Sequence, residues 1–405
     1  MKNIYQLFRE QTAKYRGEVI FYSRQNDAWK SQNWEDFEEQ VYDFACALLA
    51  KGLTKGASVA ILAGNIPEWT IIDVATIAAG GVGVGIYPTS SPEQCEYIIN
   101  HSNAEFLFVD SLKQLEKTEQ MRLRLPKLKE IICLEVSNNA TSCEDFINFG
   151  KQNRAEFLPR VEEIGYNAKP EDITIMVYTS GTTGQPKGAM LSHRYILNSC
   201  ESLRQTIPIF DTDISFSYLP GCHVAERISG IYNRLYNGAA AYFVDDLSKL
   251  YAYMLEVQPT VFASLPRFFE KIYAKVVSEH GSDASEQSLK DAFGGRIRLL
   301  TSGGAPLPNE IADFFAKRNL PILQAYGLTE NICVAFNRAD DFRFGTVGKA
   351  MPMCDIKIAD DGEILVKSPM MFSGYYKDAS KTAAMFDENG WLKIGDLGSI
   401  DGEGF

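Results

Sequence analysis

The sequence of 405 residues has little of what several classes of protein require. It contains only four histidines, and none of its eight cysteines forms a Cys-x-x-Cys pair, so nothing in it supports a zinc site. Basic residues are also scarce, because 40 lysines and arginines stand against 52 acidic residues and give a net charge of −12. Nucleic acids and anionic membranes are bound by basic patches, so neither is a predicted partner.

Long apolar runs are missing as well. The longest apolar stretch, residues 74–87, is interrupted by four glycines and is shorter than the roughly 20 apolar residues that a membrane-spanning helix needs. The N-terminus carries Lys2, Arg9 and Glu10 and shows no apolar signal-peptide core. We therefore predict reduced cysteines, no transmembrane segment and a cytoplasmic location.

Helical and strand patterns alternate through residues 1–335. Apolar residues recur at helical spacing over residues 34–51, and short apolar runs predict strands that are buried on both faces. These predicted strands cover residues 58–62, 82–86, 106–109 and 130–134. Such alternation is typical of parallel sheets with helices on both faces, so the predicted fold class is α/β.

The same patterns predict three units along the chain. A first α/β unit covers residues 1–165, and a second covers residues 166–340. The polar residues 136–170 are interpreted as a surface connection between these two units, and the polar residues 278–290 as a mobile loop. In residues 341–405 the apolar residues alternate with a period of two, which predicts an antiparallel β unit.

A turn rich in Gly, Ser and Thr follows an apolar strand and carries one lysine, within residues 178–188. Glycines let the backbone approach an anion, and successive backbone N–H groups can form an anion nest. Because Lys187 is followed by Gly188 and not by Ser or Thr, the turn is not a Walker A loop. The predicted phosphate-binding residues are Thr179, Ser180, Gly181, Thr182, Thr183, Gly184 and Lys187.

This turn resembles the signature loop of the acyl-adenylate-forming (AMP-binding) enzymes, a family that includes acyl-CoA synthetases, luciferases and the adenylation domains of peptide synthetases. Other motifs of the family follow in the family's order, and segments at 64–69 and 87–89 also fit, so the resemblance covers nearly the whole chain. The later motifs are Ser-Gly-Gly-Ala-Pro-Leu at 302–307, Gln-Ala-Tyr-Gly-Leu-Thr-Glu at 324–330, Gly-Glu-Ile-Leu-Val at 362–366, Gly-Tyr-Tyr at 374–376 and Gly-Asp-Leu-Gly at 395–398.

The resemblance implies two α/β sheet subdomains and a distorted antiparallel β-barrel, packed as one large domain. Family members continue beyond the Gly-Asp-Leu-Gly motif into a smaller C-terminal domain, which carries a lysine needed for adenylation. The sequence ends at Phe405. We therefore expect a chain that is limited to the large N-terminal domain and that is impaired in turnover.

The resemblance also implies a role for each motif, with ATP, Mg²⁺ and CoA as cofactors and substrates. The residues implied in catalysis are Lys187, Thr329, Glu330 and His223, and those implied in binding Mg²⁺ are Glu330 and Thr182. Tyr326 would stack on adenine, and Asp396 would bind the ribose hydroxyls. The remaining nucleotide-binding residues are expected to be Gly303, Gly304, Ala305, Pro306, Gln324, Ala325, Gly327, Leu328 and Thr329. A solvated surface acid is the alternative interpretation of Glu330.

The substrate class rests on residues 219–227 and 266–273, which resemble long-chain acyl-CoA synthetases. His223 would lie near the substrate carboxylate at the mouth of an acyl tunnel, and a hydrogen-bonded structural histidine is the alternative. For Glu226 and Arg227 we favour a structural ion pair between neighbouring helices. Peptide-synthetase domains place an aspartate, which binds the substrate amine, after the segment that corresponds to residues 219–227. In this sequence no aspartate follows that segment before Asp245, which argues against an amino acid substrate.

The leading hypothesis is therefore a fatty acyl-CoA synthetase, which activates a fatty acid as acyl-AMP and transfers it to CoA. Residues 274–295 are short for the long-chain branch, and Asn331 stands where Ser or Thr is usual, so a medium-chain acid or an acyl carrier protein as acceptor stays open. A module that binds a nucleotide or acyl-adenylate without turnover is a further alternative. The sequence also leaves a homodimer open.

Overall fold

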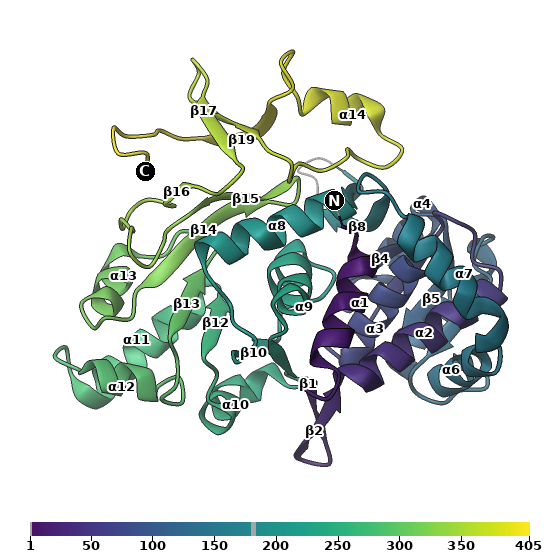
Figure 1. Cartoon of the computed structure of the whole chain (residues 1–405). Coiled ribbons are helices and arrows are strands. Elements are labelled where there is room, and N and C mark those ends of the chain that lie inside the picture. Colours follow the sequence, from purple (N-terminus) through teal and green to yellow (C-terminus); the bar gives the residue numbers. More distant parts are fainter. Residues whose placement is uncertain (1, 180–183) are drawn as a thin grey trace.

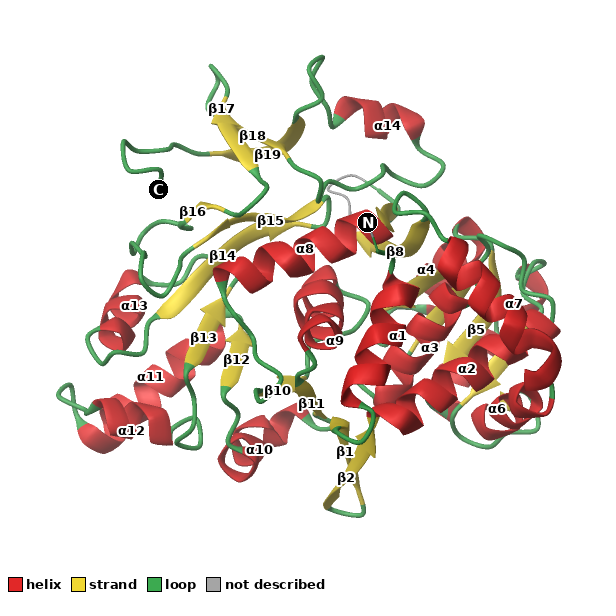
Figure 2. Cartoon of the chain, viewed as in Figure 1, coloured by secondary structure: helices red, strands yellow, loops and turns green. Residues whose placement is uncertain are grey.

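The computed structural model describes residues 2–179 and 184–405 as several α/β layers (Figures 1 and 2). The largest sheet has seven strands in the order β7-β6-β5-β3-β4-β8-β9, all parallel to their neighbours except β9. Its strands are β3 (Ser58–Leu62), β4 (Val82–Ile86), β5 (Ala104–Val109), β6 (Glu130–Cys133), β7 (Thr141–Ser142), β8 (Ile173–Thr179) and β9 (Lys187–Ser192).

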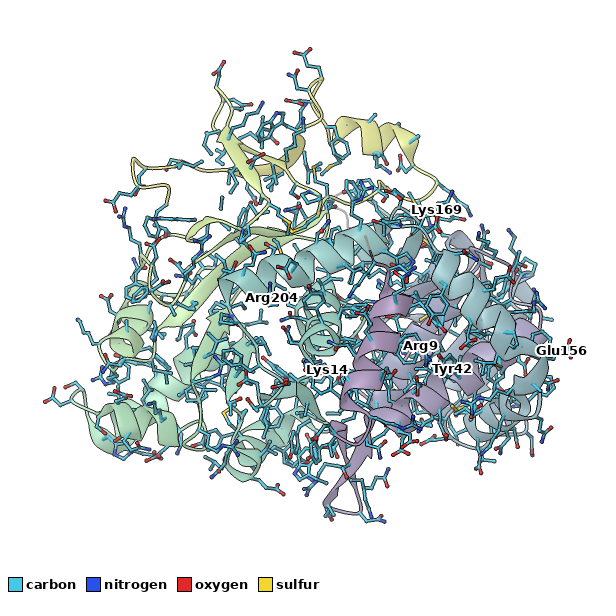
Figure 3. The ribbon with its side chains drawn as sticks, viewed as in Figure 1. Arg9, Lys14, Tyr42, Glu156, Lys169 and Arg204 are labelled. Carbon is cyan, nitrogen blue, oxygen red and sulfur yellow. The ribbon has the colours of Figure 1, made fainter. Side chains whose placement is uncertain are left out.

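Helices cover both faces of this sheet. On one face, apolar residues of five helices join one core with Val59, Ile61 and Phe106; these helices are α1 (Ile4–Tyr15), α2 (Trp34–Ala50), α3 (Pro67–Ala78), α6 (Cys143–Gln152) and α7 (Arg154–Asn167). Arg9 of α1 lies over the ring of Tyr42 of α2, with the guanidinium carbon 5.5 Å from the ring centre (Figure 3). The other face is covered by α4 (Pro92–His101), α5 (Leu112–Glu119) and the residues Met121 and Leu125 that flank η1 (Arg122–Arg124).

A second, smaller sheet draws its strands from distant parts of the chain. Its order is β10-β11-β1-β2, with β10, β11 and β1 parallel and β2 antiparallel to β1. The strands are β1 (Val19–Gln25), β2 (Ala28–Asn33), β10 (Ile214–Ser217) and β11 (Ala240–Phe243). The rings of Tyr22 and Tyr242 stack across it, with their centres 4.1 Å apart. The segment between β9 and β11 also forms α8 (His193–Thr206), η2 (Ala225–Tyr232) and α9 (Asn233–Asn237).

The third sheet carries the predicted nucleotide motifs. Its order is β12-β13-β14-β15-β16, parallel from β12 to β14 and antiparallel beyond. The strands are β12 (Val261–Ser264), β13 (Leu299–Ser302), β14 (Ile322–Leu328), β15 (Asn331–Phe336) and β16 (Lys349–Ala350). The neighbouring helices are η3 (Leu247–Lys249), α10 (Leu250–Val257), α11 (Pro266–His280), α12 (Glu286–Asp291) and α13 (Asn309–Ala316).

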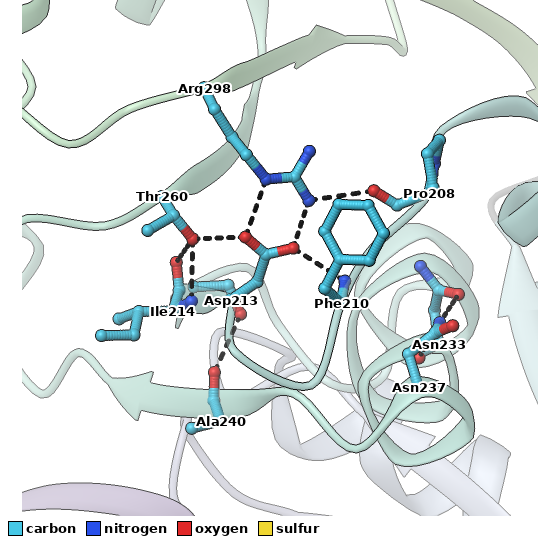
Figure 4. Close-up of polar contacts among 10 residues, drawn as sticks. Pro208, Phe210, Asp213, Ile214, Asn233, Asn237, Ala240, Thr260 and Arg298 are labelled. Atoms are coloured by element: carbon cyan, nitrogen blue, oxygen red, sulfur yellow. Dashed lines mark hydrogen bonds and ion pairs between the residues drawn. The ribbon is translucent and has the colours of Figure 1, made fainter.

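A buried carboxylate joins the second and third sheets (Figure 4). Asp213, which precedes β10, accepts hydrogen bonds from Arg298 Nε at 2.9 Å and from the Thr260 hydroxyl at 2.7 Å, and both donors flank strands of the third sheet. Phe210 N also donates to this carboxylate at 2.8 Å. The second Arg298 nitrogen pairs with the carboxylate as well. Three of these four bonds therefore link the segment before β10 to the third sheet, while the Phe210 bond is local.

The C-terminal part is antiparallel, as the period of two predicts. Strands β17 (Asp355–Ile358), β18 (Glu363–Lys367) and β19 (Leu392–Leu397) form a three-stranded sheet, and α14 (Ala379–Ala384) lies between β18 and β19 in the chain. In Figure 1 this part is yellow and lies beyond β15 and β16. A closed barrel stays a prediction.

Two sequence predictions about connections are wrong. The predicted surface connection at 136–170 contains α6 and α7, and α12 begins inside the predicted mobile loop at 278–290. The apolar face of α7 is narrow, with Val161 and Gly165 buried and Leu158 and Ile164 partly buried, and Pro159 lies inside the helix. Strand pairing also crosses the proposed boundary at residue 165, because β8 and β9 belong to the first sheet and β1 and β2 to the second. The three-unit division itself stays a prediction.

No helix in the described part of the chain is long and apolar enough to cross a membrane.

Candidate functional site

The predicted phosphate loop connects two antiparallel strands. Thr179 ends β8 and Lys187 begins β9, and the two residues face each other as partners in the ladder. Gly184 has open space where a Cβ would lie. The four other predicted loop residues, Ser180, Gly181, Thr182 and Thr183, lie outside the described residues. The loop thus begins at the carboxyl end of a buried strand of a mostly parallel sheet, where ligands of open α/β sheets bind.

The Thr-Glu pair of the second nucleotide motif forms the two-residue turn of a hairpin. Leu328 of β14 pairs with Asn331 of β15, so Thr329 and Glu330 alone make the turn. Both are buried, with 9% and 8% of their surface exposed, which overturns the interpretation of Glu330 as a solvated surface acid. The Tyr195 hydroxyl of α8 donates to the Thr329 carbonyl at 3.0 Å and accepts from Ile332 N at 3.1 Å, which anchors the turn from the helix side.

The segment 372–376, which includes the Gly-Tyr-Tyr motif, joins this turn to the phosphate loop. Phe372 N donates to the Glu330 carbonyl at 2.8 Å. Further along, Met190 N donates to the Gly374 carbonyl at 3.0 Å and Tyr376 N donates to the Gly188 carbonyl at 2.8 Å, so the segment runs beside β9. Two motifs that lie far apart in the chain, at 178–188 and 324–330, are therefore held by one backbone segment.

Tyr375 of this segment contacts two of the predicted catalytic side chains, Glu330 and Lys187. Its hydroxyl donates a hydrogen bond to Glu330 Oε1, and Lys187 Nζ lies 5.1 Å from the centre of its ring. Burial and the neighbouring Glu330 carboxylate raise the pKa of Tyr375, so its hydroxyl keeps its proton and stays a donor. The structure thus brings Lys187 and Glu330 together around one tyrosine, whose individual role the sequence analysis missed.

The predicted adenine-binding turn follows β13 and lies beside β14. Ser302 pairs with Gln324, and an added Cβ on Gly303 would lie 3.5 Å from the Ala325 carbonyl. Gln324 fixes the end of the turn, because its Oε1 accepts from Leu307 N at 3.2 Å. The motif residues Gly303, Gly304, Ala305 and Pro306 are therefore next to the motif on β14.

Gly327 occupies a position where only glycine fits. A Cβ there would lie 1.9 Å from the Ile332 carbonyl oxygen of the neighbouring strand, at the irregularity between β14 and β15. The close approach of the two strands just before the turn sets the position of Thr329 and Glu330.

The predicted adenine-stacking and ribose-binding residues contact each other. The Tyr326 hydroxyl donates a hydrogen bond to Asp396 Oδ2. Burial, with the neighbouring Asp396 carboxylate, raises the pKa of Tyr326, so the hydroxyl is protonated at neutral pH. Asp396 lies in β19, where Gly395 N donates to Glu363 Oε1 at 3.0 Å. The C-terminal sheet therefore supplies one wall beside the nucleotide motifs.

Comparisons with known proteins agree with this arrangement. The AMP-binding enzyme family matches residues 8–376. The chain belongs to the AMP-binding enzyme family. It is 32% identical over 461 residues to the long-chain-fatty-acid–CoA ligase ACSBG2 of Xenopus laevis, covering 99% of this chain and 62% of that protein. The human ACSBG2 ligase is 30% identical, with 99% and 68% covered. The chain spans less than two thirds of the length of the first of these relatives.

Solved structures show the same fold. The N-terminal domain of FACL13 from Mycobacterium tuberculosis superposes with a TM-score of 0.83 at 21% identity, covering 100% of this chain and 98% of that one. The mixed α/β fold that the sequence predicts is thereby confirmed.

His223 of this AMP-binding enzyme lies in the turn before η2. Its Nδ1 accepts a hydrogen bond from Ala225 N at 3.1 Å, which is a local contact. Solvent reaches the ring, yet the surrounding protein lowers its pKa by desolvation, so the imidazole is neutral at pH 7. No hydrogen bond among the described residues connects His223 to the Lys187–Tyr375–Glu330 group, so its catalytic role stays a prediction.

Glu226 and Arg227 are structural, as predicted, but they have separate partners. Arg227 pairs with Asp73 of α3, and both side chains are fully buried. The Tyr232 hydroxyl donates to the same carboxylate at 2.7 Å, while Glu226 pairs with Arg234 of α9. The bonds to Asp73 hold η2, and with it the His223 turn, against α3, and the Glu226–Arg234 pair joins η2 to α9.

A cavity of about 600 Å³ lies elsewhere in the enzyme. Its lining includes Gly56, Val82 and Thr174 at the amino ends of β3, β4 and β8. The predicted nucleotide-binding residues follow the carboxyl ends of strands, so this cavity is not the nucleotide site.

Proposed function

We propose that this protein activates a fatty acid as acyl-AMP and, in its complete form, transfers the acyl group to CoA. The observation that supports this most is the convergence of Lys187 and the buried Glu330 on Tyr375, beside the adenine and ribose motifs. Its relatives are long-chain-fatty-acid–CoA ligases. An apolar carboxylic acid is therefore the proposed substrate class.

The proposed reaction has two steps. A carboxylate oxygen attacks the α-phosphorus of ATP, the bond to the bridging oxygen of the β-phosphate breaks, and pyrophosphate leaves. The CoA thiol then attacks the acyl carbon, its proton is released, and AMP leaves with the carboxylate oxygen that attacked. Both steps are promoted mainly by positioning and by neutralising charge on the phosphates.

Each side chain has one proposed task in the first step. Lys187 holds the β- and γ-phosphates with its charge, and Thr329 contacts the α-phosphate. Tyr326 stacks on adenine, and Asp396 accepts hydrogen bonds from the ribose. The last two are bonded to each other in the structure, so we propose that the ribose competes with the Tyr326 hydroxyl for Asp396.

The Glu330 side chain fits a magnesium ion. Its carboxylate offers the hard oxygen ligands that Mg²⁺ prefers, and within the described chain only Oε1 has a hydrogen-bond partner. Glu330, together with Thr182, is the proposed ligand set. When bound, Mg²⁺ would supply positive charge to the phosphates. A cytoplasmic location also stays a proposal, and so do a homodimer and a carrier protein as acceptor.

Pyrophosphate release on a panel of carboxylic acids tests this function. We expect ATP-dependent release with medium- or long-chain fatty acids and none with amino acids. Release with amino acids alone would contradict the proposed substrate class. Binding of ATP without release on any acid would favour a nucleotide-binding module instead. Offering CoA and a pantetheine-bearing carrier protein side by side would identify the acceptor.

A further inference from the structure

Backbone hydrogen bonds hold both ends of the segment 372–376, one end at Glu330 and the other at β9. Phe372 N bonds to the carbonyl of Glu330, and the Gly374–Tyr376 backbone bonds to β9 just after Lys187. Tyr375 N donates to the Thr382 hydroxyl of α14 at 2.8 Å. At Gly374 the backbone has φ +108°, and an added Cβ would lie 2.7 Å from Thr382 Cγ2, so glycine is required. The backbone at Tyr375 is therefore fixed by contacts within the chain itself.

The Tyr375 side chain is fixed as well. It is 6% exposed and packs edge-on against the ring of Phe372, whose centre is 4.9 Å away. From this position its hydroxyl reaches Glu330 Oε1, and its ring face lies toward the ammonium group of Lys187. Rings at this distance attract cations. One rigid side chain thus contacts an anion and a cation that have separate proposed tasks.

The contact with Glu330 has a specific geometric consequence. In the described part of the chain, Tyr375 is the only side chain that hydrogen-bonds to this carboxylate. A single donor on Oε1 selects one rotation of the carboxylate plane and leaves Oε2 available for another partner. Partners of this kind orient metal-binding side chains and raise the affinity of metal sites in proteins.

We propose that Tyr375 is a positioning residue, whose hydroxyl orients the Glu330 carboxylate for a divalent cation while its ring supports Lys187. This inference rests on the proposed function, in which Glu330 binds Mg²⁺. Removing the hydroxyl alone should weaken binding of the cation and leave the contact of ATP with Lys187 in place. Tyr375 itself touches no reacting atom.

The neighbouring tyrosine provides a matched control. Tyr376 lies in the same segment, but its hydroxyl accepts from Asn103 Nδ2 at 2.9 Å, on the α4 side of the first sheet. Tyr375→Phe and Tyr376→Phe each remove one hydroxyl and keep the ring, so both variants should fold. Circular dichroism and thermal unfolding would verify this.

The experiment measures ATP binding by calorimetry, first with EDTA and then at increasing Mg²⁺ concentrations. We expect Tyr375→Phe to need at least about tenfold more Mg²⁺ than wild type for the same gain in ATP affinity, since loss of such a partner typically weakens metal binding 10- to 100-fold. Its ATP affinity in EDTA should equal that of wild type. Tyr376→Phe should match wild type in both measurements.

A second comparison separates positioning from a general loss of structure. If Tyr375 acts through Glu330, Tyr375→Phe should change Mg²⁺ dependence little in a Glu330→Gln background. An equal effect in both backgrounds would overturn the inference. So would a Tyr375→Phe protein with wild-type Mg²⁺ dependence. If wild-type binding of ATP does not respond to Mg²⁺ at all, the proposed function fails, and the inference fails with it.

Discussion

Lowering the pH should destabilise the fold through one buried histidine, His193. This residue begins α8, is 2% exposed, and accepts a hydrogen bond from Ile4 N at 3.1 Å through Nδ1. Burial lowers its pKa to about 4 from the ordinary 6.5. Protonation of Nδ1 would also remove the acceptor that joins the start of α8 to the start of α1.

The direction and size of the effect follow from these two pKa values. Between about pH 6.5 and 4 the unfolded chain binds more protons than the folded protein, so the free energy of unfolding falls as pH drops through this window. From about pH 8 to pH 5 the loss due to His193 is about 2 kcal/mol. His193→Gln keeps an acceptor and does not titrate, so it should lack this part of the pH dependence.

Urea unfolding of both proteins at about pH 8 and pH 5 measures the difference. Other titrating groups contribute alike to the two proteins, so the comparison isolates His193. The wild type should lose about 2 kcal/mol more than His193→Gln between the two pH values. Equal losses in the two proteins would refute the reasoning, because a histidine that shifts its pKa on folding must couple pH to stability.

Three further variants test the site and its support. Lys187→Ala should weaken ATP binding in calorimetry by about 1.5–3 kcal/mol, the value of a charge-assisted hydrogen bond, and unchanged affinity would rule out its phosphate role. Tyr326→Phe keeps the ring but releases Asp396, so AMP should bind about two- to tenfold more tightly; weaker binding would show that the hydroxyl serves the nucleotide instead. Arg227→Met leaves the fully buried Asp73 unpaired and should lower the free energy of unfolding by about 3–5 kcal/mol, whereas wild-type stability in urea would contradict a structural ion pair.

The parts of the fold that could be predicted from the sequence are those whose structure is determined by the local pattern of residues. Strands β3 and β4 lie at the predicted residues, because largely apolar runs of five residues are buried on both faces. The sequence analysis missed helix α7, because its apolar face is narrow and Pro159 lies inside the helix. Its stability comes from contacts with α2 and α3, which local patterns do not report.

The site likewise has features that local motifs indicate and contacts that only the tertiary structure shows. The motifs identified the Thr329–Glu330 turn and Lys187, and both follow or begin strands as expected. The contact between Tyr375 and Glu330 joins residues 45 positions apart, and the pair Asp73–Arg227 joins residues 154 positions apart. Such pairs depend on how sheets and helices pack, so no spacing in the sequence indicates them. Asp73 in particular appears in the sequence only as a charge before an apolar run.

The central claim, that a carboxylate is activated by transfer of AMP, can be tested directly with isotope-labelled substrate. A fatty acid with ¹⁸O in its carboxylate would be incubated with the complete form of the protein, ATP, Mg²⁺ and CoA, and the nucleotide products would be analysed by mass spectrometry. The attacking oxygen stays on the α-phosphorus when the thiol takes the acyl group, so the account predicts AMP that carries one ¹⁸O atom. Formation of ADP with the label in inorganic phosphate would contradict it, because that result requires an acyl-phosphate and not an acyl-adenylate.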